Sequence, residues 1–150
     1  MVKNDDINRH ILQELSRNAR LSNLELADRV GLSPSACLRR VQELERSGVI
    51  TGYRVVLDRA KLGIGFTAYI AVGLSQHTRD SQRAFERAIA RASEVIECHN
   101  ITGTVEYLLR VEAADLAAYK VFHTDVLGTL PQVSAITSYV VMESPKDLRA

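Results

Sequence analysis

Two short helical patterns separated by a tight turn, between Ser22 and Gly48, constrain this chain more than any other feature. Ser22 and Glu25 have the spacing of a capping box, in which each side chain satisfies a backbone N–H of the other residue. Gly31 is the residue type that ends a helix in a left-handed turn. Ser33 followed by proline is a second helix start, because proline at the first helical position loses no hydrogen bond. The pattern therefore predicts a helix-turn-helix.

Apolar spacing defines the faces of these helices that should point inward. The expected inward residues are Leu24, Ala27 and Val30 in the first helix and Cys37, Val41 and Leu44 in the second. Upstream, an apolar stripe predicts a further helix of about three turns, which begins at Asn4, Asp5 or Asp6. That stripe consists of Ile7, Ile11, Leu12 and Leu15. Three helices then share one small core.

The second helix of the pair, from Ser33 to Ser47, should turn its outer flank toward solvent or a ligand. Its N-terminal turn would approach base edges in a DNA major groove, and its two arginines could reach guanine or phosphate. The expected DNA-binding residues are Ser22, Ser33, Pro34, Ser35, Ala36, Arg39, Arg40 and Glu43. The alternative is a helical hairpin packed inside an ordinary domain, with both arginines solvated.

Length and composition favour two small domains, the first of them weakly basic. The chain has 150 residues, of which 46% are hydrophobic, enough to bury a core. Residues 1–63 carry eleven Lys or Arg against eight Asp or Glu, net +3, whereas residues 64–150 carry eight against ten, net −2. This balance favours a polyanionic partner without requiring one. Because no apolar run approaches the ~20 residues that span a bilayer, we expect a cytoplasmic protein with no membrane partner.

Residues 50–64 alternate apolar and polar side chains and predict a strand that links the two domains. An isolated strand leaves its backbone groups unpaired, so we expect it to pair with the same strand of a second copy in a two-fold dimer. A hairpin within one chain is the alternative. The expected division is a helix-turn-helix domain over 1–49, this linker strand, and a second domain over 65–150.

The second domain has the order strand, helix, strand, strand, helix, strand. The expected strands are 66–74, 95–102, 107–112 and 133–142, with one helix starting at Thr78, Asp80 or Ser81 and another at Asp115. The second of these helices should point Leu116, Tyr119, Phe122, Val126 and Leu130 inward. This order predicts an α+β fold, a ferredoxin-like βαββαβ sheet with both helices on one face. The other face, which includes either Tyr69, Thr137 and Tyr139 or the alternate set of strand residues, carries enough apolar residues to need a second sheet against it.

Five segments of the sequence resemble the Lrp/AsnC family of feast/famine transcription regulators, and the resemblance covers essentially the whole chain. They are Asp5–Leu15, Gly31–Tyr53, Glu97–His99, Gly103–Tyr107 and Thr137–Glu143. The resemblance implies a winged helix-turn-helix domain that binds double-stranded DNA and a ferredoxin-like domain that senses an amino acid. It also implies dimers that assemble into octamers or similar discs.

The resemblance further implies an effector site around one turn. The expected effector-binding residues are Thr102, Gly103, Thr104, Val105, Glu106, Tyr107, Thr137 and Tyr139. Gly103 admits close approach, N–H groups of a turn can take an α-carboxylate, and Glu106 can hold an α-ammonium. Thr104 stands where family members often have an acidic residue, which weakens the expected grip on the ammonium. A different, weak or absent ligand and a plain hairpin turn are the alternatives.

The sequence carries no motif of ordinary enzymatic chemistry. Its histidines lack metal-ligand spacing, and we expect no metal, no cofactor and no catalytic residue. Two alternatives stay open. One is an enzyme like the sirohaem decarboxylases, in which His99 or His123 with Arg110 would contact a tetrapyrrole carboxylate. The other is an amino-acid sensor that does not bind DNA.

Overall fold

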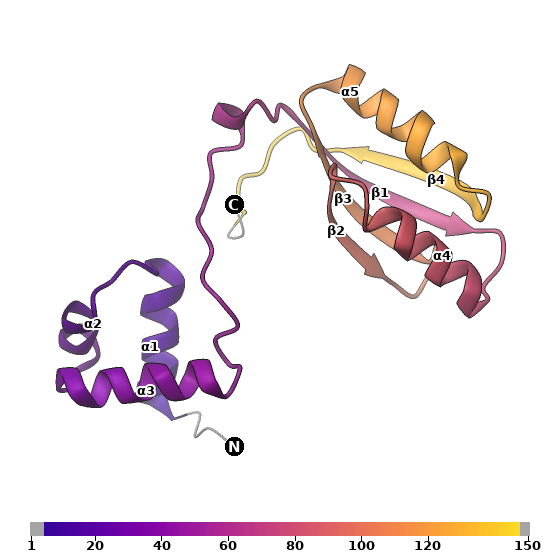
Figure 1. Ribbon diagram of the computed structural model, residues 1–150. Helices are drawn as coiled ribbons and strands as arrows, with labels where there is room; N and C mark the ends of the chain where they lie inside the picture. The colour runs from indigo at the N-terminus through magenta and orange to yellow at the C-terminus, as the bar shows by residue number, and fades with distance from the viewer. Residues whose placement is uncertain (1–4, 148–150) are drawn as a thin grey trace. The chain divides into compact units, whose positions relative to one another are not determined.

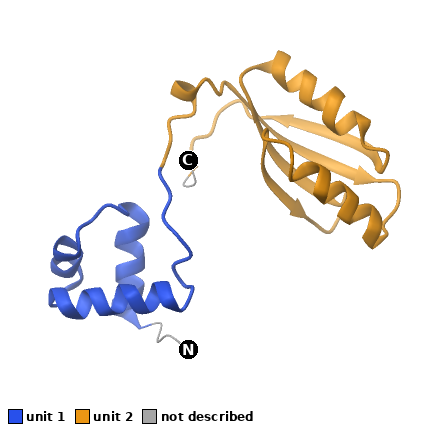
Figure 2. Cartoon of the chain, viewed as in Figure 1, with its two compact units in different colours: residues 1–55 blue, residues 56–150 orange. Residues whose placement is uncertain are grey.

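The computed structural model describes residues 5–147, and the chain divides into two compact units, residues 1–55 and 56–150 (Figure 2). The boundary falls inside the predicted linker. Unit 1 contains α1 (Asp6–Arg17), α2 (Asn23–Val30) and α3 (Pro34–Arg46). Unit 2 contains η1 (Ala60–Leu62), β1 (Phe66–Leu74), α4 (Arg79–Ile89), β2 (Val95–Asn100), β3 (Tyr107–Ala113), α5 (Leu116–Val121), η2 (Phe122–Val126), η3 (Leu127–Thr129) and β4 (Val133–Val140), as Figure 1 shows. No described helix is long and apolar enough to cross a membrane.

The helices of unit 1 begin at residues that the sequence predicted. Asp5 caps α1 by accepting a hydrogen bond from a backbone N–H at 2.9 Å, and Asn4 lies outside the described residues. Ser22 and Glu25 form the full capping box of α2, with the Ser22 N–H donating to Glu25 Oε2 at 2.8 Å. Ser33 caps α3 directly before its first-turn proline. These local contacts confirm the helix-turn-helix.

The core of unit 1 corrects one expected position on α2. Ile11, Cys37 and Leu44 are buried as predicted. The prediction that Leu24 points inward is wrong, because its side chain is 67% exposed. Leu26 is buried instead. Leu26 and Val30 are four residues apart, so they lie one above the other on α2 and form its inward stripe.

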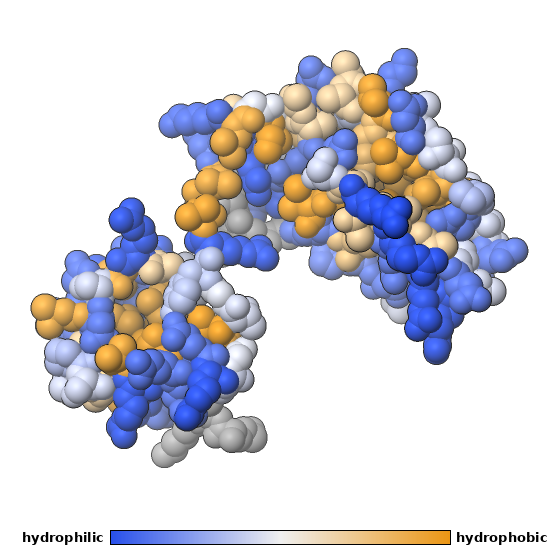
Figure 3. Space-filling view, in the orientation of Figure 1, coloured by the Kyte–Doolittle hydropathy of each residue, from blue (hydrophilic) through white to orange (hydrophobic). Residues whose placement is uncertain are grey.

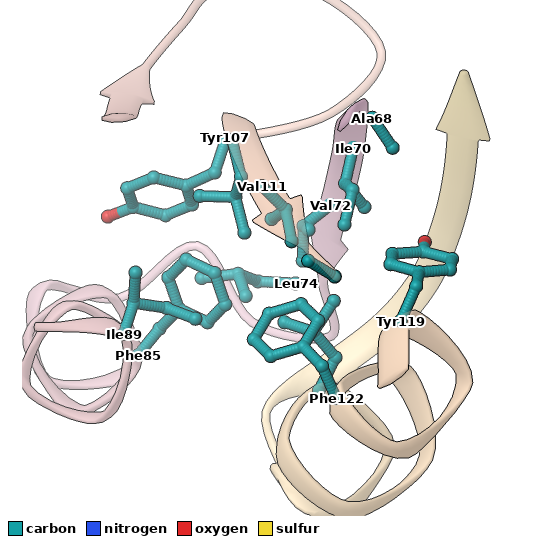
Figure 4. Close-up of a cluster of buried hydrophobic side chains, with 13 residues drawn as sticks. Ala68, Ile70, Val72, Leu74, Phe85, Ile89, Tyr107, Val111, Tyr119 and Phe122 are labelled. Atoms are coloured by element: carbon teal, nitrogen blue, oxygen red, sulfur yellow. The ribbon is translucent and has the colours of Figure 1, made fainter. Parts of the chain in front are cut away.

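Unit 2 is a four-stranded antiparallel sheet with the order β2-β3-β1-β4, which confirms the predicted ferredoxin-like topology. Alternate residues of β1, including Ala68, Ile70 and Val72, are fully buried on one face. Figure 4 shows two helical segments on that face, with Phe85 projecting toward the strands from α4 and Phe122 from η2, which directly follows α5. The sheet and its two helices therefore enclose one core.

The second helical segment of unit 2 differs from prediction at Leu116, in the first turn of α5, and at Leu127, which follows a π-helical turn. Leu116 was expected to point inward but is 63% exposed, whereas Leu127 is 0% exposed. The π turn Phe122–Val126 adds a residue relative to regular α-helical spacing. This extra residue shifts the inward face by one position, so that Leu127 enters the core.

The linker is not a strand in the single chain. Residues 51–58 form no ladder and are followed by the short helix η1, so neither the predicted strand nor a hairpin is present there. The only helices and strands among residues 5–55 are the three helices, so the wing has no paired strands. Val55 and Val56 are strongly exposed, and Figure 3 shows hydrophobic surface along this part of the chain. A strand needs a pairing partner, and the single chain supplies none to these residues.

The face of the sheet away from the helices carries apolar side chains in register. Tyr69 of β1 lies opposite Tyr139 of β4, and Ala71 lies opposite Thr137. Tyr139 is exposed, whereas Tyr69 is half-buried. A second sheet against this face stays a prediction.

The same face also holds a cluster of paired charges, which the sequence did not predict. The Arg110 guanidinium lies 3.1 Å from a carboxylate oxygen of Glu112 and 3.4 Å from one of Asp147. Arg59 lies 3.3 Å from the second oxygen of Glu112. Arg110 and Glu112 are almost fully buried, and buried charges persist only when paired. The cluster fastens the segments around η1 and after β4 to the sheet.

The π turn makes a matched pair of substitutions informative. We expect Leu127→Ala to lower the free energy of unfolding of unit 2 by about 2–5 kcal/mol, because it leaves a cavity in the core. We expect Leu116→Ala to change it by less than about 0.5 kcal/mol, since that side chain is exposed. Chemical denaturation followed by circular dichroism measures both. Equal losses of unfolding free energy in the two variants would contradict the inward position of Leu127 and the exposed position of Leu116.

Candidate DNA-binding and effector sites

The exposed flank of α3 carries most of the residues predicted to contact DNA. Ser33, Ser35 and Arg39 are exposed, while the opposite flank is buried in the core of unit 1. The Ser33 hydroxyl accepts a hydrogen bond from the backbone N–H of Ala36 at 3.3 Å and lies 3.3 Å from the Ser35 hydroxyl. The first turn of α3 is therefore well defined and open to a ligand. Pro34 and Ser22 are also exposed, although the Ser22 hydroxyl is engaged in the capping box.

Arg40 does not lie free on this flank as expected. One nitrogen of its guanidinium lies 3.0 Å from each carboxylate oxygen of Asp5 and 3.0 Å from Asn8 Oδ1, and its side chain is only 28% exposed. It therefore fastens α3 to the first turn of α1. The contact spans 35 residues, and no helical pattern within α3 could reveal it. Glu43, also half-buried, pairs with Arg46 on the same helix.

A residue outside the predicted set fixes the start of α3. The side-chain amide of Asn23, the first residue of α2, donates a hydrogen bond to the Pro34 carbonyl at 2.8 Å. This bond crosses the turn between the two helices. It sets the position of the first turn of α3 relative to α2, so Asn23 is a positioning residue. An asparagine beside the Ser22 cap was the only sequence clue.

The turn between β2 and β3 centres on the carboxylate of Glu106. Glu106 Oε2 accepts a hydrogen bond from the Leu74 N–H at 2.6 Å, and Oε1 lies 2.7 Å from Nδ1 of His77. The Leu74 N–H, followed by the charge of His77, holds the pKa of this carboxyl below its usual range. Gly103, at φ 145°, takes a backbone conformation that favours glycine. The predicted ammonium acceptor is thus present, but both of its oxygens already have partners within the chain.

Exposure differs along the predicted effector turn. Thr102, Gly103 and Thr104 are exposed, and Val105 is half-buried. Two backbone hydrogen bonds fix the far side of the turn, from Ile101 N–H to the Glu106 carbonyl at 2.8 Å and from Glu106 N–H to the Val72 carbonyl at 3.2 Å. Between these anchors, the exposed backbone leaves room for a small ligand.

Tyr107 faces away from this turn. Its ring is buried on the helix side of the sheet, 4.6 Å from the ring centre of Phe85 (Figure 4). Its hydroxyl donates a hydrogen bond to Glu86 at 2.7 Å, and burial together with this bond raises the pKa of Tyr107 to about 12. The tyrosine lines a shallow groove of about 460 Å³ between α4 and β2. The ring therefore points away from the turn within the single chain, and a role of Tyr107 in effector binding stays a prediction.

Tyr139 lies farther along the sheet from the Glu106 turn than Thr137, which is opposite Ala71, two residues from Gly73. Tyr139 is opposite Tyr69, four residues along β1 from Gly73, which corresponds to about 13 Å at 3.3 Å per residue. Ser134 is the residue of β4 that comes close to the turn, because its hydroxyl donates to the Gly73 carbonyl at 3.1 Å. The single chain therefore brings the turn together with the end of β1 and the start of β4.

Of the residues proposed for a tetrapyrrole site, His99 and Arg110 lie near each other, because Arg110 is 3.8 Å from the Glu97 carboxylate that His99 also contacts, but His123 lies apart from them. Arg110 is held by carboxylates on the open face, whereas His123 packs edge-on against Tyr119 of α5, at 6.0 Å between ring centres, on the helix face. His99 lies 3.3 Å from Glu97. Across the described residues 5–147, no group of three or more His, Cys, Asp or Glu side chains has the geometry to hold a metal ion.

Sequence profiles of two protein domains match this chain. A winged helix-turn-helix DNA-binding profile matches residues 4–51, which include α1, α2 and α3. The profile of the Lrp/AsnC ligand binding domain matches residues 67–150, which include the sheet and the Glu106 turn. The chain belongs to the Lrp/AsnC family. It is accordingly a transcription regulator by family, and both the resemblance and the fold class are confirmed.

Known relatives of this Lrp/AsnC chain support the same assignment. The leucine-responsive regulatory protein of Escherichia coli is 39% identical over 142 residues, covering 95% of this chain and 87% of the relative. A transcriptional regulator of Neisseria meningitidis, solved in complex with L-methionine, has a TM-score of 0.91 and 34% identity, covering 95% of this chain and 92% of that one. An AsnC family regulator of Agrobacterium tumefaciens has a TM-score of 0.90 and 31% identity, covering 95% and 93%.

The lowered pKa of Glu106 predicts a pH-dependent contribution to stability. A carboxyl whose pKa is lower in the folded chain stabilises the fold above its unfolded pKa, and this contribution disappears as the pH falls through the folded pKa. Glu106→Gln should therefore lower the free energy of unfolding at neutral pH. The difference from the wild type should shrink below about pH 4.5. Urea denaturation over a pH series measures this, with the exposed Glu143→Gln as control; a difference independent of pH would contradict it.

Proposed function

We propose that this protein binds double-stranded DNA through the exposed flank of α3. The observation that carries the proposal is the two-sided character of this helix. One flank is buried in the core of unit 1, and the other presents exposed Ser33, Ser35 and Arg39 next to a fixed first turn. The N-terminal part of such a helix reaches base edges in the major groove. Asn23 and Arg40 act indirectly, by holding α3 in position.

We propose that an amino acid or a related small molecule binds at the Glu106 turn and changes the affinity for DNA. Two of the relatives support an amino-acid effector, one by its name as a leucine-responsive protein and one by its complex with L-methionine. The exposed turn offers backbone N–H groups for an α-carboxylate and the Glu106 carboxylate for an α-ammonium. The effector can shift DNA affinity only through its different affinity for two states of the protein.

We propose that the working form is a homodimer and that four dimers form an octamer. The exposed linker residues Val55 and Val56, with the open sheet face at Tyr69 and Tyr139, offer apolar surface to a second copy. A two-fold dimer would place two α3 helices in major grooves about 34 Å apart. The octamer rests on the family resemblance. Because the target is DNA, we place the protein in the cytoplasm, acting as a regulator and not as an enzyme.

Substitutions on α3 separate contact residues from positioning residues. We expect Arg39→Ala to weaken DNA binding by about 1–3 kcal/mol, because a guanine or phosphate contact is lost, with unchanged stability. Arg40→Ala should instead lower the free energy of unfolding of unit 1 by about 1 kcal/mol. Fluorescence anisotropy with a duplex from upstream of the protein's own gene, and chemical denaturation, measure the two effects.

Lys120→Ala, which removes an exposed positive charge from α5, is the matched control for Arg39→Ala and should leave DNA affinity unchanged. Unchanged affinity in Arg39→Ala would contradict the assignment of α3. If the wild-type protein binds no duplex even at low salt, the chain is a sensor that does not bind DNA.

A thermal-shift screen of the twenty amino acids tests the effector proposal. A ligand that binds only the folded chain at a hundredfold excess over its Kd should stabilise it by about 2.7 kcal/mol and raise its Tm. Thr104→Asp should increase the shift, because it adds a carboxylate beside the ammonium site. Thr124→Asp, which adds the same carboxylate at an exposed position outside the turn, is the control and should leave the shift unchanged. The absence of a shift with every amino acid would overturn the proposed effector class.

A further inference from the structure

The two oxygens of the Glu106 carboxylate are held in different ways. Oε2 accepts the backbone N–H of Leu74 at 2.6 Å, a bond anchored at the end of the central strand β1. Oε1 lies 2.7 Å from Nδ1 of His77, on the loop between β1 and α4. The carboxylate itself is largely buried, whereas the His77 side chain is 77% exposed. One oxygen is therefore fixed by the fold, and the other is covered by a side chain that faces solvent.

We propose that His77 determines ligand specificity at this turn by occupying Glu106 Oε1 until the α-ammonium of an amino acid displaces it. The inference rests on the proposed effector site and names the residue with which the ligand competes. His77 would make the site favour ligands with a primary ammonium, because a cation competes with the imidazole for a carboxylate oxygen better than a neutral donor does. A ligand without that group would leave the Glu106–His77 contact in place.

The surroundings of His77 allow this displacement. Ser75 ties the start of the loop to β4, since its N–H donates to the Gln132 carbonyl at 2.8 Å, and Thr78 caps α4 at the end of the loop. His77 lies between these anchors, so its side chain can rotate into solvent while the backbone stays in place. A contact between an exposed imidazole and a carboxylate is weak, which keeps the cost of breaking it small.

Oε2 keeps the carboxylate oriented while Oε1 changes partner. The Leu74 bond does not involve the loop, so displacement of His77 leaves Glu106 aimed as before. On the other side, the exposed backbone of Thr102, Gly103 and Thr104 can receive the ligand's carboxylate. A Cβ on Gly103 would meet no heavy atom within 4 Å, so the space above the turn is open in the single chain. An α-amino acid could thus span from Oε1 to the turn.

The test compares amino-acid binding to the full-length wild type and to His77→Ala. Because the substitution removes the competitor, it should lower the Kd for L-methionine or L-leucine by about two- to fivefold, the equivalent of one exposed ion pair. A residue that merely supported the turn would change the Kd in the opposite direction. Gln76→Ala, at the exposed neighbouring position, should leave the Kd unchanged. Isothermal titration calorimetry provides the readout, and N-acetyl-L-methionine should bind neither protein.

The outcomes distinguish this inference from the proposed function. If an amino acid binds the wild type but His77→Ala binds it equally or more weakly, the proposed competition by His77 is wrong. The proposed effector site is then still supported. If N-acetyl-L-methionine binds as well as L-methionine, the ammonium contact is wrong. If thermal-shift screening detects none of the twenty amino acids on either protein, both proposals fail. Binding that appears only in His77→Ala supports the competition, and Glu106→Gln in that background should abolish it.

Discussion

The pairing of β1 on both of its edges is the constraint on which unit 2 depends. This strand lies between β3 and β4, so both of its neighbours take their register from it. Its alternation sends Ala68, Ile70 and Val72 toward the helices and Tyr69 toward the open face. Its final residues, Gly73 and Leu74, then offer a carbonyl to Ser134 and an N–H to Glu106. The same strand that organises the core also orients the carboxylate of the candidate effector site.

Features with a local cause were predictable from the sequence, and features with a distant cause were not. The caps at Ser22 and Ser33 involve residues three apart, and strand alternation involves residues two apart. The contact of Arg40 with Asp5 spans 35 residues and that of Glu106 with Leu74 spans 32, so no short pattern contains both partners. The π turn was not predicted for another reason. A pattern search with a fixed helical period does not detect a single extra residue within a helix.

The linker and the open face show how far a single chain can satisfy the predicted fold. Extended residues 51–58 have the alternation of a strand but no neighbouring strand, and Val55 and Val56 stay exposed. On the open face, Arg110 and Glu112 need no second copy, because they neutralise each other within the chain. An interface built on this face would therefore gain its energy from tyrosine and other apolar contacts and would leave the charge cluster intact.

The sequence predicted Arg40 on the open flank of α3 and gave His77 no role. Both side chains contact a carboxylate of the same chain. Their consequences differ because of burial and of the number of contacts. Arg40 reaches both oxygens of Asp5 and also Asn8, and its side chain is mostly covered, so removing it takes a charged donor away from three partly buried oxygens. His77 contacts the carboxylate through one ring nitrogen and is mostly exposed, so water or a ligand can replace it at little cost. By this argument Arg40 is part of the scaffold of α3, whereas His77 is exchangeable at the turn.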